Sequence, residues 1–132
     1  MDSSTRDFGR EVITLIRDPA VVELDRLLSG RYKGKQAAVW REETQNPVVL
    51  EGFERLGPDI VDLVVFRILD LVDEGALDIV FPDSGLRASD DVRGEYAGWF
   101  EGAPGWRHGF AKERFNDYYS EDDATESESP AP

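Results

Sequence analysis

The stretch PDIVDLVVFRILDLVDEG, from Pro58 to Gly75, decides the fold because it predicts the longest and most apolar helix of the chain. At 100° per residue, its charged side chains fall within a stripe roughly 140° wide, and aliphatic side chains fill the rest. A helix this apolar is normally central and covered by several neighbours. We therefore predict a helical bundle around residues 58–74. The stripe comprises Asp59, Asp62, Arg67, Asp70, Asp73 and Glu74, opposite Ile60, Val61, Val64, Val65, Ile68, Leu69, Leu71 and Val72.

Two apolar residues, Leu63 and Phe66, project within this acidic stripe. If another element covers them, the helix is apolar nearly all round and they belong to the core. If they are exposed, they are aromatic and aliphatic anchors ringed by charge, which is how interface hot spots are built. The sequence leaves these two alternatives open.

Turn-forming residues divide the chain before this helix. Asp18-Pro19 and Asn46-Pro47 are helix-start pairs, in which the first residue is the N-cap and proline takes the first helical position. Gly30 and Gly57 are typical helix ends. These signals predict separate helices over about 7–17, 19–29, 35–45, 47–56 and 58–74.

The segment after Gly75 changes period. Alternating apolar residues lead into Pro-Asp-Ser-Gly, which predicts a small β-hairpin over residues 77–88. Helices over about 90–101 and 106–119 follow, joined by a Gly-Ala-Pro-Gly turn. Their aromatic residues are predicted to pack against each other and the central helix: Trp99, Phe100, Trp106 and Phe110.

The predicted fold class is mostly α, formally α+β because of the one small hairpin. Residues 1–119 form a single helical domain, and residues 120–132 form a disordered acidic tail. A chain of 132 residues can bury a core without a disulfide or metal, and it contains no cysteine.

The composition predicts a cytoplasmic protein of a bacterium. Twelve arginines against three lysines suggest a GC-rich genome, and the polar N-terminus lacks the apolar run of a signal peptide. The longest apolar stretch is interrupted by charges, so we expect no membrane association.

The net charge of −13 limits the partners that we expect. The last thirteen residues carry five acids and no base, and residues 1–119 still carry −8. This charge repels nucleic acids and anionic membranes, so neither is an expected partner. A basic protein partner is a candidate.

The sequence does not favour catalysis, a metal or a cofactor. His108 is the only histidine, and its place beside Arg107 at a predicted helix start disfavours the charged imidazole. Hard cations accept oxygens spaced like those of the acidic stripe, and Glu42-Glu43 and Asp90-Asp91 supply more. A carboxylate stripe is, however, usually a solvated helix face, and no EF-hand or Glu-x-x-His pair is present.

A basic segment is the candidate for anion binding. Five bases and no acid lie between Arg26 and Arg41. They do not form a Walker loop, because Gly30 to Gly34 is one residue too short and Gln36 follows Lys35. A generic anion site remains compatible with the sequence. Its candidate residues are Arg31, Lys33, Lys35, Arg107 and His108.

Three functional hypotheses follow. The leading one is a non-enzymatic, acidic protein-binding module: an adaptor, an inhibitor or an immunity-type protein. Its predicted interaction surface consists of Asp59, Asp62, Leu63, Phe66 and Asp70. The alternative is a small ligand-binding or enzymatic domain with the anion pocket described above. The third is a self-associating structural protein, a homodimer with Leu63 and Phe66 at its two-fold interface.

Overall fold

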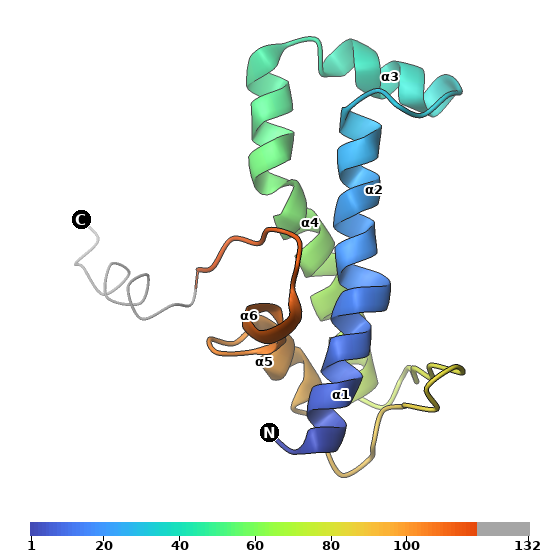
Figure 1. The fold of residues 1–132 in the computed structure, drawn as a ribbon, viewed down its shortest axis with the longest axis vertical. Helices are drawn as coiled ribbons and strands as arrows, with labels where there is room; N and C mark the ends of the chain where they lie inside the picture. Colours follow the sequence, from blue (N-terminus) through green and yellow to red (C-terminus); the bar gives the residue numbers. More distant parts are fainter. Residues whose placement is uncertain (119–132) are drawn as a thin grey trace, which may run out of the picture.

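The computed structural model describes residues 1–118, and the predicted tail at 120–132 lies outside them. The fold is mostly helical, as predicted. Two long helical rods run antiparallel, with a short helix across one end and two more beside the other half (Figure 1). The first rod joins α1 (Ser3–Glu11), the π-helix η1 (Val12–Arg17) and α2 (Asp18–Leu28); then come α3 (Lys35–Glu43), the second rod α4 (Pro47–Asp73), α5 (Tyr96–Glu101) and α6 (Trp106–Phe110).

The predicted break at Asp18-Pro19 is wrong, because the first rod continues through it. The backbone N–H of Asp18 bonds to the carbonyl of Ile13, five residues back, so a wider π-helical turn joins α1 to α2. Pro19 lies in the first turn of α2, where a missing N–H is tolerated. The N-cap of the rod is instead Asp2, whose carboxylate accepts from the Thr5 N–H at 2.7 Å.

Helix α4 also continues where the sequence predicts an end, at Gly57-Pro58. Pro58 has no N–H for the carbonyl of Glu54, one turn earlier. The guanidinium of Arg114 supplies the missing donor and bonds to that carbonyl at 2.8 and 3.3 Å. A contact from a distant segment thus replaces the lost helical bond, and α4 forms one helix of 27 residues.

The core lies between the lower halves of the rods and α5 and α6 (Figure 1). The ring of Phe8 lies 4.9 Å from that of Tyr96 and 6.0 Å from that of Trp106, measured between centroids. Phe100 and Trp106 are fully buried, and Trp99 and Phe110 pack against the core as partly buried side chains. All four aromatic residues therefore lie in the core or against it, as predicted, but the ring contacts of Trp106 are with Phe8 and Tyr96.

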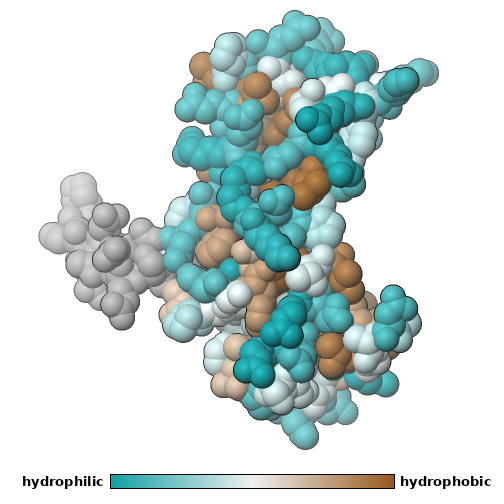
Figure 2. All heavy atoms as spheres, in the orientation of Figure 1, coloured by the Kyte–Doolittle hydropathy of each residue, from teal (hydrophilic) through white to brown (hydrophobic). Residues whose placement is uncertain are grey.

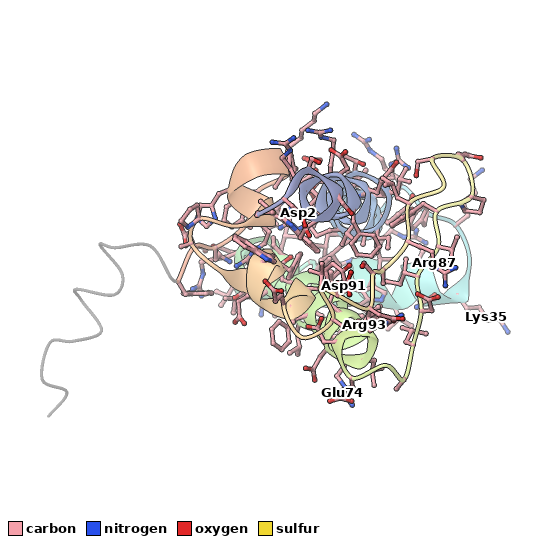
Figure 3. The ribbon with its side chains drawn as sticks, turned by 90° about the horizontal axis from the view of Figure 1, so that it is seen from below. Asp2, Lys35, Glu74, Arg87, Asp91 and Arg93 are labelled. Atoms are coloured by element: carbon pink, nitrogen blue, oxygen red, sulfur yellow. The ribbon has the colours of Figure 1, made fainter. Side chains whose placement is uncertain are left out.

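The segment between α4 and α5 contains less β structure than predicted. Within the described residues, β pairing is limited to one antiparallel bridge between Val80 and Arg87. The guanidinium of Arg93 holds the segment to the end of α4, because it bonds to the Val72 carbonyl at 2.6 Å and to Asp78 at 3.3 Å. In Figure 3, Arg93 is labelled near the middle of the view, below Asp91.

Asp73 shows that the acidic stripe of α4 is not simply a solvated face. Its carboxylate accepts hydrogen bonds from the backbone N–H groups of Gly94, Tyr96 and Ala97 at 2.8 to 3.0 Å. The N–H groups of Tyr96 and Ala97 are donors in the first turn of α5 that have no partner within that helix, and Gly94 lies just before it. α5 begins only at Tyr96, so the predicted helix over 90–101 is shorter than expected.

The predicted last helix over 106–119 is wrong beyond Phe110. Residues 111–118 leave the helical conformation at Ala111 and run across both rods; we call them the strap. Their backbone bonds to side chains of the first rod, as described below, and those bonds replace the helical ones. Within residues 1–118, no helix combines the length and apolarity needed to cross a bilayer.

Candidate binding groove beside helix α4

The carboxylate of Asp62 lies inside the protein, between two arginines from other elements. Asp62 is only 8% exposed. Arg17 donates through Nε to Oδ1 at 2.8 Å, and Arg107 donates through Nη1 to Oδ2 at 2.9 Å. The prediction that Asp62 faces solvent is therefore wrong. Its place on the helix turns it toward the end of η1 and toward α6.

Arg17 joins this buried cluster to the strap. It is fully buried, and its guanidinium donates to Asp18 Oδ1 at 2.9 Å and to the carbonyls of Glu113 and Arg114 at 2.9 and 2.7 Å. The other oxygen of Asp18 accepts from the backbone N–H of Lys112 at 2.8 Å. The strap thus has its shape because buried charges need its polar backbone.

Arg107 joins the same cluster to the end of α5. Its Nε and Nη2 donate to the carbonyls of Phe100 and Glu101 at 3.1 and 3.0 Å. The rings of Phe100 and Phe115 lie 5.2 and 5.1 Å from its guanidinium carbon. Two arginines and two aspartates balance in charge, and no buried side-chain nitrogen or oxygen lacks a partner within residues 1–118.

A groove of about 430 Å³ opens above this cluster, between α4, α5, α6 and the end of the strap. Asp62 and Arg107 form its charged floor, and aromatic and aliphatic side chains form most of its walls. We call it the α4 groove; its lining residues are Asp59, Asp62, Leu63, Phe66, Phe100, Glu101, Arg107 and Tyr118. Four of the five residues predicted as an interaction surface therefore line one groove, and Asp70 is not among its lining residues.

An apolar stripe on α4 continues outward from this groove. It consists of Leu56, Ile60, Leu63 and Val64, which are 41%, 51%, 68% and 54% exposed; we call it the α4 stripe. The prediction that Ile60 and Val64 face the core is wrong. The first rod and α5 cover only the side of α4 that carries Val65, Leu69 and Val72, so the opposite side remains open.

The side of α4 that faces solvent is therefore not the side that the sequence predicted. Leu63 is exposed, Phe66 is partly buried at the groove, and Asp70 pairs with Arg67 at 2.8 Å. On the face of the molecule shown in Figure 2, hydrophobic atoms form separate patches among hydrophilic ones.

Asp59 closes one end of the groove through the strap. Its Oδ2 accepts from the Tyr118 hydroxyl at 2.6 Å, and its Oδ1 accepts from the Asn116 amide at 2.9 Å. The Tyr118 hydroxyl donates a hydrogen bond to Asp59, and this bond raises the pKa of Tyr118 above the ordinary value. Desolvation makes a smaller contribution in the same direction. The last described residue of the strap is thus tied to α4 in its neutral form.

We predict that alkaline pH weakens the bond between the strap and α4. A folded-state pKa above the unfolded value stabilises the fold below about pH 10, and this contribution is lost as the pH rises through the higher folded value. An NMR titration of the Tyr118 ring should give a pKa above that of a free tyrosine, and Asp59→Asn should lower it. An ordinary pKa for Tyr118 in the unmodified protein would contradict the bond.

The residues of the candidate anion pocket are not brought together. Arg107 is buried and each of its three nitrogens donates a hydrogen bond, and His108 Nε2 lies 2.8 Å from Asp117 Oδ2. The basic segment connects α2 to α3 at the opposite end of the rods (Figure 1), and Lys35 points outward at the edge of the molecule in Figure 3. All five bases of that segment are exposed: Arg26, Arg31, Lys33, Lys35 and Arg41.

Sequence reasoning missed the residues that organise the site from outside α4. Arg17 ends an apolar helical run and shows no pattern that marks it as buried, Glu101 lies at the end of α5, and the place of Tyr118 depends on the non-helical strap. Within residues 1–118, no group of three or more acidic or histidine side chains is placed to hold a metal ion. No family model, curated protein or solved structure matches this chain.

Proposed function

We propose that the protein is a binding module, of the adaptor or inhibitor type, that docks a partner protein on the α4 stripe and the α4 groove. The observation that carries this proposal is the exposure of four aliphatic side chains on one helix face beside a groove with aromatic walls. Single exposed apolar residues need no explanation, but a contiguous apolar patch with a polar rim is typical of interaction sites. Covering such a patch removes apolar surface from water and so favours binding of the partner.

The charge of the chain supports a basic partner. Three carboxylates and one guanidinium lie around the groove, and the whole chain carries −13. Complementary potentials speed association and disfavour partners of like charge. A second copy of this chain would carry the same −13, so self-association is opposed by repulsion.

The buried cluster supports a structural task for the charged residues nearest the groove. Asp62 and Arg107 are bonded to other groups of the protein and their charges are balanced within the cluster. Such groups hold the rods, α6 and the strap in place, and a partner then meets a rigid surface.

A photo-crosslinking amino acid at position 63 tests this proposal directly. In cells that make the protein, we expect position 63 to form an adduct with one second protein of basic charge, identified by mass spectrometry. Val39 provides the matched control, because it is 59% exposed on α3, away from the α4 stripe. Equal adducts from both positions, or none from position 63, would refute docking on α4.

The same partner allows the surface to be tested by mutation. Leu63→Arg should weaken its binding at least tenfold, because a charge replaces a central apolar contact and meets a basic partner. Val39→Arg should leave the affinity unchanged. If the partner is an enzyme that loses activity on binding, the module is an inhibitor; if its activity persists, the module is an adaptor.

A further inference from the structure

We propose, on the basis of the proposed function, that the docking element of the partner is a basic amphipathic helix. It lies along the α4 stripe and places one arginine or lysine side chain in the α4 groove. The proposed function requires only a basic partner, and a basic helix is one chemistry that meets this requirement. It depends on the spacing of the stripe, the walls of the groove and the charges at its rim.

The spacing of the exposed apolar residues fits a helical partner. Leu56, Ile60 and Leu63 follow one another at steps of four and three. This spacing is typical of a helix that packs against a second helix, because the side chains of each helix then insert between those of the other. An extended partner strand would need an open sheet edge, and the described residues contain only one isolated bridge.

The walls of the groove fit a long side chain with a positive end. Phe66 is partly buried and lines the groove, and its ring makes no aromatic or cation–π contact among the described residues. Arginine and lysine lay their aliphatic stems along apolar walls and keep the charged end at the rim. Leu63 belongs to both the stripe and the groove, so one partner helix can reach both.

The charges at the rim select a cation over an anion. The carboxylate of Glu101 has no hydrogen bond or ion pair within residues 1–118, and the partners of Asp59 there, the Asn116 amide and the Tyr118 hydroxyl, are neutral donors. The one positive charge, on Arg107, is already matched by Asp62. An acidic peptide or an anionic lipid surface would therefore be repelled.

Two synthetic peptides test the inference on the full chain. One carries leucines at steps of four and three with arginines on its remaining positions, and the other carries glutamates in place of the arginines. We expect the arginine peptide to bind, to shift the NMR signals of the Leu63 methyls and the Phe66 ring, and to weaken as salt is added. The glutamate peptide should bind at least tenfold more weakly.

Matched variants separate the groove from general charge. Phe66→Leu combined with Glu101→Gln should weaken the arginine peptide about tenfold, since it removes a cation–π contact and a rim charge. Asp91→Asn removes an acidic charge from the exposed segment before α5 and should leave the affinity within twofold. Circular dichroism of each variant shows that the fold is retained.

Each contrary outcome overturns a different statement. Equal binding of the two peptides, or shifts away from α4, would refute the basic helix. A dimer in sedimentation experiments that Leu63→Arg dissociates would make a second copy the occupant. If a partner crosslinks at position 63 while Phe66→Leu with Glu101→Gln leaves its affinity unchanged, the proposed function stands and the inference fails.

Discussion

Asp62→Ala is expected to lower the free energy of unfolding by about 3–5 kcal/mol, because it leaves two buried arginines without their shared counter-ion. Arg17 and Arg107 are 0% and 5% exposed, so their charges are poorly solvated once the carboxylate is gone. Domains of this size have a total stability of about 5–15 kcal/mol, and the loss is therefore a large fraction of the whole. The strap should loosen as well, since Arg17 holds its backbone.

Urea unfolding followed by circular dichroism measures this loss. Asp70→Ala is the control, because it removes a carboxylate from an exposed pair with Arg67 on the same helix and should cost less than about 1 kcal/mol. Asp62→Asn keeps an acceptor and the side-chain volume, and it gives a measurable value if the alanine variant does not fold. Similar losses for Asp62→Ala and Asp70→Ala would show that the buried cluster does not stabilise the fold.

Trp106→Ala is expected to cost about 3–5 kcal/mol, the usual range when a buried tryptophan is truncated. Trp106 is 0% exposed and contacts the rings of Phe8 and Tyr96, so its removal leaves a cavity at the centre of the core. Thermal or urea unfolding measures the loss. A cost below about 1 kcal/mol would mean that α6 is not anchored through this ring.

The same ring explains why position 9 is a glycine. A Cβ at Gly9 would fall within the Trp106 ring, so Gly9→Ala should destabilise by about 1–3 kcal/mol, whereas in the Trp106→Ala background it should stabilise by up to about 1 kcal/mol. Gly98→Ala in α5 is the control, because a Cβ at Gly98 would have no neighbouring atom within 4 Å. A double-mutant cycle without coupling between positions 9 and 106 would contradict this contact.

The sequence alone predicted the helical class and the apolar segment that became the lower half of α4. Both depend on local composition and on period, which a helix imposes on its own side chains. Sequence also indicated that Leu63 and Phe66 break the acidic pattern, and the structure places both beside one groove.

Helix boundaries depended on contacts from elsewhere in the chain. Pro58 predicts a helix break because proline lacks a backbone N–H. The helix continues because Arg114 donates a hydrogen bond to the carbonyl of Glu54, which Pro58 leaves without its helical partner. The strap reads as a helix because its side chains have helical spacing, yet its backbone binds Arg17 and Asp18 instead. No local pattern records a partner that lies 60 or 96 residues away.

The side of α4 that faces solvent is the largest difference between prediction and structure, and it has one physical cause. Periodicity treats every carboxylate as solvent-facing, because an unpaired buried charge is costly. Asp62 and Asp73 are turned toward the protein because two arginines and the start of α5 provide donors there, and this leaves Ile60 and Val64 outside. The sequence determined which residues α4 carries; only the tertiary structure decided which of them face solvent, since that depends on charges supplied by other elements.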